Sequence, residues 1–138
     1  MSPIAVHEAS HVVTATVLNT PWTHAAVRPD GTGFLRFDGH QASWGDATLH
    51  RRAAIVALAG AHGEAIYREQ RAFWSRSDHK IASSYLNSAA ETFEELSFMV
   101  RRCVERYWPA IQRVAEHLEL LGTISPQEAR QCMQAPRS

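Results

Sequence analysis

The residues most able to do chemistry lie near the N-terminus, where His7, Glu8 and His11 form the pattern His-Glu-x-x-His. On a helix, residues four apart lie on one face, one turn apart. The imidazoles of His7 and His11 can therefore bind one metal ion, and Glu8 lies beside that ion. This arrangement is typical of zinc hydrolases, in which the glutamate takes a proton from a water molecule. The spacing predicts a Zn²⁺ site with Glu8 as general base.

A catalytic zinc site needs a third protein ligand. The residues from 12 to 19 include no His, Asp, Glu or Cys, so that ligand must come from further along the chain. The candidates are Asp46, His62, Glu64, Asp78 and His79. We favour Asp78, because it is expected in the first turn of a helix, where the backbone favours an anion, and its side chain is short. Glu64 could instead orient one of the histidines. Alternatively, Asp78 is an ordinary aspartate in the first turn of a helix and Glu64 an exposed helix residue, and neither has a role at a metal site.

The composition excludes several classes of protein. The chain has 138 residues, 45% hydrophobic and 20% charged, and a formal net charge of zero. This composition is typical of a globular protein, and the charge balance does not indicate binding to nucleic acid or to an anionic membrane. No apolar run approaches the roughly 20 residues of a membrane span, and the N-terminus has no secretory signal pattern. The two cysteines form neither a disulfide framework nor a zinc-binding spacing. We expect one cytoplasmic domain over 1–138 with free thiols.

The elements that position these residues are expected to be mostly helical. Ser2-Pro3 is typical of a helix start, and the first helix should run to about Leu18, although its β-branched residues favour a strand. A hairpin is expected over 22–37, with its turn at 29–33, followed by a loop over 38–46. The sequence therefore predicts a mainly α protein of the α+β class with a small hairpin near the N-terminus.

Further helices are expected over 47–70, capped by Asp46, and over 78–90, capped by Ser77, with a connection over 71–76 between them. A longer helix from about 91 to 122 should kink or restart at Pro109, and a capping box at 125–128 opens a short last helix. Gly60 and Gly63 lie inside the 47–70 helix, where a glycine costs about 1 kcal/mol relative to alanine. They indicate close packing or a nearby site.

Four segments follow one another in the order of a known family. They are His-Glu-Ala-Ser-His at 7–11, a strand and turn at 24–34, Ala-Leu-Ala-Gly-x-x-x-Glu at 57–64, and a Ser-x-Asp helix start within 75–82. In these the chain resembles the peptidase domain of the FtsH-type zinc metallopeptidases, a helical zincin-type fold. The resemblance implies that Asp78 is the third zinc ligand and that extended substrate binds near Gly33, Phe34 and Leu35. Ser10 stands where that family has glycine.

The expected function is therefore a zinc-dependent metallopeptidase that acts on peptides or unfolded proteins. The ATPase module and membrane anchor of the FtsH-type family do not occur in these 138 residues. We therefore expect that a separate ATPase or another partner would deliver folded clients. Two alternatives remain: a zinc-stabilised regulatory or interaction module with little activity, and a zinc hydrolase of non-peptide amides. The sequence leaves the oligomeric state open.

Overall fold

The computed structural model describes residues 1–38, 46–69, 76–87, 89 and 91–134. Its helices are α1 (Pro3–Val17), α2 (Ala47–Arg68), α3 (Arg76–Leu86), α4 (Phe93–Arg106), α5 (Trp108–Leu121) and α6 (Pro126–Met133). Its strands are β1 (Trp22–Val27), β2 (Gly33–Phe37) and β3 (Thr123–Ile124). The predicted fold class is confirmed: the protein is mostly helical with one small antiparallel sheet. None of the described helices is both long and apolar enough to cross a membrane.

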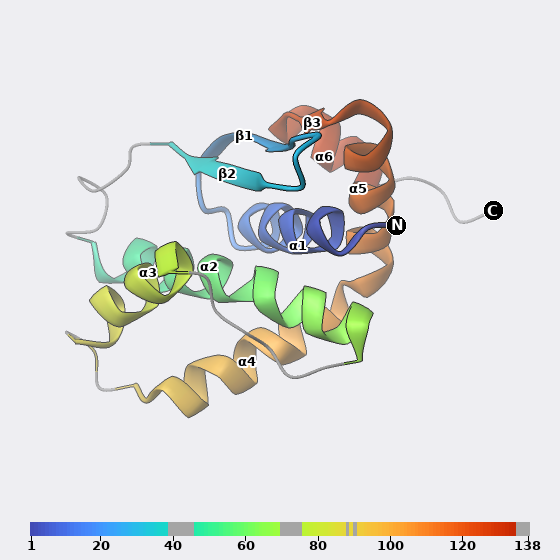
Figure 1. Cartoon of the computed structure of the whole chain (residues 1–138). Helices are drawn as coiled ribbons and strands as arrows, with labels where there is room; N and C mark the ends of the chain where they lie inside the picture. Colours follow the sequence, from blue (N-terminus) through green and yellow to red (C-terminus); the bar gives the residue numbers. More distant parts are fainter. Residues whose placement is uncertain (39–45, 70–75, 88, 90, 135–138) are drawn as a thin grey trace.

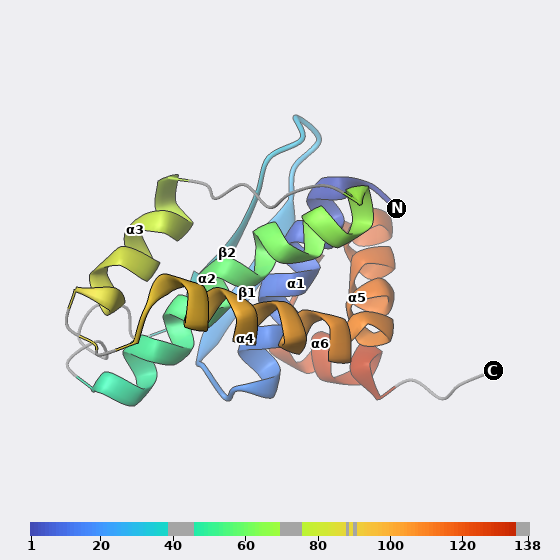
Figure 2. The same cartoon turned by 90° about the horizontal axis from the view of Figure 1, so that it is seen from below.

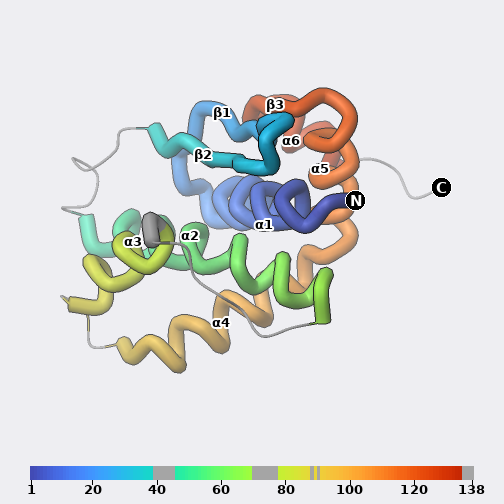
Figure 3. Tube along the Cα trace, in the orientation of Figure 1, coloured from blue at the N-terminus to red at the C-terminus, as the bar shows by residue number. Residues whose placement is uncertain are grey.

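Helix α1 lies in the middle of the molecule. The sheet covers one side of α1, and α2 packs on the other side (Figures 1 and 3). Helices α5 and α6 lie at one end of the molecule, and α3 lies at the opposite end, against α2. Helix α4 packs against the outer side of α2 and forms the lowest layer, which Figure 2 shows from below. The hydrophobic core lies between these layers and includes the fully buried Leu58, Leu96, Ile111 and Leu118.

Helix α1 forms although its β-branched residues favour a strand, because its ends and its burial favour a helix. At its start, the Ser2 hydroxyl accepts a hydrogen bond from the Ala5 amide (3.3 Å). At its end, Asn19 has a φ of 53° and the Thr20 amide donates to the Ala15 carbonyl (2.9 Å), as in a Schellman motif. Most residues between these ends are buried. Tertiary packing therefore outweighs the local propensity.

The sheet has the strand order β2-β1-β3, with both neighbours antiparallel to β1. Ala25, buried in the central strand, pairs with Leu35 on one side and Ile124 on the other. The predicted hairpin is thus present. The strand β3 was not predicted, because two residues are too short to show an alternating pattern. Strand β2 lies at the edge of the described sheet.

Most predicted helix boundaries agree with the structure. Asp46 caps α2 through the amides of Thr48 and Leu49, and Pro109 lies in the first turn of α5, so the long predicted helix is two helices. The capping box at the start of α6 is present. Helix α3 begins at Arg76 and ends before Asn87. Ser77 therefore lies inside it, and the predicted bounds of 78–90 were wrong at both ends. At the C-terminal end the helix stops before Asn87, a residue type that favours a helix end. Residues 39–45 of the predicted loop and 71–75 of the predicted connection lie outside the described residues.

Candidate metal centre

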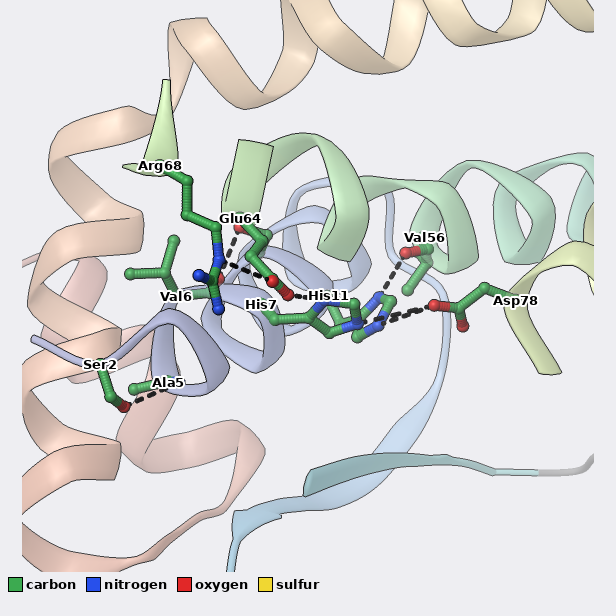
Figure 4. A network of polar contacts seen from close by, with 10 residues as sticks. Ser2, Ala5, Val6, His7, His11, Val56, Glu64, Arg68 and Asp78 are labelled. Atoms are coloured by element: carbon green, nitrogen blue, oxygen red, sulfur yellow. Dashed lines mark hydrogen bonds and ion pairs between the residues drawn. The ribbon is translucent and has the colours of Figure 1, made fainter. Parts of the chain in front are cut away.

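Three side chains from two helices converge at one place. His7 and His11 come from α1, and Asp78 comes from the first turn of α3. Oδ2 of Asp78 lies 3.6 Å from Nε2 of each histidine, and the three ligand atoms lie within 4.8 Å of one another (Figure 4). The separation is too long for a hydrogen bond but close to the roughly 3.3 Å between two ligands of one tetrahedral ion with bonds near 2.0 Å. The group can therefore hold a metal ion.

Hydrogen bonds on the far side of each ring determine which nitrogen faces the centre. Nδ1 of His11 lies 2.6 Å from the Val56 carbonyl oxygen, which can only accept, so Nδ1 carries the proton. Nδ1 of His7 lies 3.0 Å from Oε1 of Glu64, a carboxylate that also accepts. In both rings the proton on Nδ1 leaves the Nε2 lone pair free for a metal, as in metal sites where an oxygen orients the histidine.

Glu64 is itself held in place. Its second oxygen accepts a hydrogen bond from Nε of Arg68, one turn further along α2, at 3.0 Å. Arg68 and Glu64 lie one behind the other on the side of His7 that faces away from Asp78 (Figure 4). This contact with Nδ1 of His7 is the one that an orienting role requires. Glu64 is not among the residues whose ligand atoms lie together at the candidate metal centre.

Gly60 of α2 lies directly over the two histidines. A Cβ atom at this position would lie 2.5 Å from Nε2 of His11 and 2.6 Å from Nε2 of His7. No side chain fits there without moving both ring nitrogens. Gly63, one turn along, is equally close to α1: its Cβ would lie 1.8 Å from Oγ of Ser10. These two positions explain why α2 contains glycines in its interior despite their energetic cost.

The carboxylate of Glu8 lies beside the three ligands in a buried position, with 3% of the residue exposed. Burial is the largest influence on its pKa and raises it; His11 opposes this rise, and Asp78 adds a smaller increase. Its Oε2 has no hydrogen-bond partner among the described residues. An unpartnered carboxylate oxygen in such a place suits a group that takes up and releases a proton, and a nearby cation would favour its charged form.

A cleft opens in front of this centre. Its lining includes the ligands and Glu8, together with Gly33, Phe34, Leu35 and Phe37 of the edge strand β2 and Val56 and Ile81 of the neighbouring helices. Gly33 faces Glu8 directly, since a Cβ on it would lie 2.7 Å from Cγ of Glu8. The structure thus brings all three residues predicted to bind substrate, Gly33, Phe34 and Leu35, to the wall of the same cleft.

A separate polar network holds the helix that carries Asp78. The Tyr85 hydroxyl of α3 donates to Oε1 of Glu91 (2.7 Å), and Arg51 of α2 donates to both Glu91 oxygens (2.9 and 3.2 Å). The hydrogen bond from Arg51 is the main cause that lowers the pKa of Glu91, so this residue is a carboxylate. Glu91 therefore ties the far end of α3 to α2. Nothing in the sequence indicated this network, because its members are up to 40 residues apart.

The other third-ligand candidates lie elsewhere. Asp46 caps α2. His62 is buried, with Nε2 3.0 Å from Oγ of Ser97, and burial lowers its pKa to about 4. His79 is exposed and lies next to Ser83, at 3.3 Å. The Val56 carbonyl was missed by sequence reasoning, because a backbone oxygen has no signature in the sequence.

No protein-family model matches the chain, and no curated protein matches it. The resemblance to the FtsH-type peptidases therefore remains a prediction from the motifs and their order. The spatial arrangement of His7, Glu8, His11 and Asp78 stands without it, because it follows from the structure of this chain alone.

Proposed function

We propose that the protein is a zinc-dependent metallopeptidase that hydrolyses peptide bonds in peptides or unfolded proteins. One observation carries this proposal. The ligand atoms of His7, His11 and Asp78 lie together in an open cleft, next to the buried and unpartnered carboxylate oxygen of Glu8. A metal site that only stabilises the fold has no use for such a carboxylate, whereas a hydrolytic site needs a base there.

The ligand set supports zinc as the metal. Two imidazoles and one carboxylate are a common protein ligand set of catalytic zinc, with one position left open. Zn²⁺ in such a site supplies Lewis-acid activation of water and of the scissile carbonyl. His7, His11 and Asp78 would hold the ion, and Glu64 and the Val56 carbonyl keep the two imidazoles in the tautomer that can bind it.

Glu8 would act as general base and then as general acid. It would take a proton from the attacking water on its free Oε2 and pass that proton to the leaving amine as the peptide bond breaks. Burial, and the absence of another hydrogen bond to Oε2 from the part of the chain that the structure describes, keep this carboxylate available for the transfer. The absence of a side chain at Gly33 leaves the space that Glu8 occupies.

An extended peptide fits the other wall of the cleft. Strand β2 lies at the sheet edge and contributes Gly33, Phe34 and Leu35 to the lining, so a substrate strand could pair with it beside Glu8. Only a peptide or an unfolded segment can adopt that conformation, and a separate ATPase or other partner would have to unfold stable clients. We also propose FtsH-type family membership, supported by the order of the motifs. A cytoplasmic location remains a proposal that agrees with the two free cysteines.

The test compares zinc-loaded wild type with zinc-loaded Glu8→Gln, using casein as an unfolded substrate. The variant keeps the ligands but has no base, so we expect equal zinc content and a loss of at least about a thousandfold in cleavage rate. Glu116→Gln is the matched control, because Glu116 is exposed on α5 and lies outside the cleft. This control should cleave like wild type.

Two results would contradict the proposal. Full activity in Glu8→Gln would mean that Glu8 is not the base. No cleavage by either protein, although both hold zinc, would favour the regulatory or interaction module instead. A panel of small amides in the same assay distinguishes a peptidase from a hydrolase of non-peptide amides.

A further inference from the structure

The outer face of α4 exposes apolar side chains. Leu96, Val100 and Val104 face the core and are fully buried, whereas Phe98, on the opposite face, is 65% exposed. Met99 is 36% exposed and lies on the flank of α4 towards α2, where its sulfur accepts a hydrogen bond from Arg51 (3.3 Å). Phe98 and Met99 line a groove that continues over Cys103 and Tyr107 to the end of α1. Figure 2 shows that α4 is the outermost helix on this side of the molecule. A large exposed aromatic side chain beside a groove is typical of a contact surface.

Charge is segregated along the same face. The first turn of α4 is acidic, with Glu94 and Glu95, while its second half carries three arginines: Arg101, Arg102 and Arg106. Arg101 pairs with Glu105 at 3.0 Å. Within the described part of the chain, Arg102 and Arg106 have no acidic partner and lie over the rings of Phe98 and Tyr107, at 5.8 and 5.6 Å. With Arg101 and Glu105 neutralising each other, the face is acidic at its first turn, has Phe98 in the middle, and has a net positive charge from Arg102 and Arg106 at its other end.

We propose that this face binds a second copy of the same chain, with the two α4 helices antiparallel about a two-fold axis beside Phe98. Glu95, Phe98 and Arg102 are three and four residues apart and so lie in one stripe of the helix. In the antiparallel pair, Phe98 packs against its own counterpart. Glu95 then faces Arg102 of the partner subunit, and the same pair forms again on the other side of the axis.

The charge pattern favours a second copy over other occupants. A uniformly acidic partner would be repelled by the first turn, and a uniformly basic partner by the arginines. A parallel pair of α4 helices would place like charges together. The antiparallel pair also sets the helix dipoles in opposite directions, which is favourable. The interface is small, since a 14-residue helix is only about 21 Å long. We therefore expect a weak and reversible association.

The inference is independent of the proposed peptidase activity. No residue of α4 lines the cleft at the metal centre, so the dimer leaves both clefts open. The first experiment is sedimentation velocity of the full chain from about 1 to 100 μM. We expect a reversible monomer–dimer equilibrium in wild type and a dissociation constant at least about tenfold higher in Phe98→Ser. Leu120→Ser is the matched control, because Leu120 is also exposed (83%) but lies on α5. This control should dimerise like wild type.

A charge exchange tests the antiparallel register. Arg102→Glu alone and Glu95→Arg alone should each weaken self-association about tenfold, because each sets like charges opposite one another twice. An equimolar mixture of the two variants should dimerise with nearly wild-type affinity, since both pairs are then of opposite sign. Glu95 also closes the capping box of α4, so circular dichroism must show that Glu95→Arg is folded. If Glu95→Arg is not folded, the self-association of the two single variants Phe98→Ser and Arg102→Glu tests the interface instead.

The proposal is overturned by a wild type that stays monomeric up to about 100 μM. A dimer that survives both Phe98→Ser and Arg102→Glu would likewise place the interface elsewhere. Failure of the mixture of folded variants to associate better than either alone would rule out the antiparallel arrangement.

Discussion

The two helices that supply the ligands of the candidate metal centre are built into the protein in different ways. Helix α1, with His7 and His11, runs through the centre between the sheet and α2, and most of its residues are buried. Helix α3, with Asp78, lies at the edge of the molecule and packs mainly on α2. Packing in the core therefore fixes the positions of His7 and His11, whereas Asp78 comes from a peripheral helix.

This difference separates two kinds of perturbation. A change between α1 and α2 at the ligands themselves, as at Gly60, disturbs the core and the ligands together, so the free energy of unfolding and the metal affinity should both fall. A change at Gly63, which contacts Ser10 rather than a ligand, should lower mainly the free energy of unfolding. A change that affects only the attachment of α3 should lower metal affinity and leave most of the stability.

Gly60→Ala should have the largest effect. The new methyl group would lie within 2.6 Å of both ligand nitrogens, so the rings must move. We expect zinc affinity to fall by at least about a hundredfold and the free energy of unfolding of the metal-free chain to fall by about 2 kcal/mol. Zinc competition with a chromophoric chelator and urea unfolding measure the two quantities. A stable variant with unchanged affinity would show that α1 and α2 are not this close.

Gly63→Ala should destabilise the fold and affect the metal less, because its methyl group would meet Ser10 rather than a ligand. We expect a loss of about 2 kcal/mol in urea unfolding. The double variant Ser10→Gly, Gly63→Ala should recover at least half of that loss, since the smaller residue at 10 frees the space. Strictly additive effects in this double-mutant cycle would mean that the two residues do not share one space.

Tyr85→Phe should have the smallest effect on stability and a selective effect on the metal. It removes the hydrogen bond from α3 to Glu91 but keeps the ring. We expect zinc affinity to fall about fivefold while the free energy of unfolding changes by at most about 1 kcal/mol. Tyr67→Phe is the matched control, because the Tyr67 hydroxyl bonds to the Met1 carbonyl, away from α3. Equal zinc affinities in the two variants would count against a positioning role for the network.

The sequence predicted best where local signals are strong. The caps at Ser2, Asp46 and Ser125 and the hairpin signal located the elements, and the small residues at 60 and 63 indicated the close approach of α2 to α1. It predicted less where a feature depends on tertiary contacts. The strand β3 is defined by its pairing with Ala25 and Ala26 rather than by a pattern of its own.

The same division holds within the site. The His-Glu-x-x-His spacing places two imidazoles on one face of a helix by geometry alone. The groups that orient these residues could not be predicted in this way. The Val56 carbonyl and the Tyr85–Glu91–Arg51 network depend on how distant segments pack. The structure brings Asp78 to the two histidines, whereas chemistry alone had left four other candidates open.

The most direct test is a zinc titration of the metal-free wild type and of Asp78→Ala, with the unfolding of both metal-free proteins measured alongside. We expect one zinc ion per chain in wild type, a loss of at least about a hundredfold in affinity in the variant, and nearly equal stability without metal. Unchanged affinity in Asp78→Ala at sub-stoichiometric zinc would contradict it, because the third ligand would then have to come from another residue.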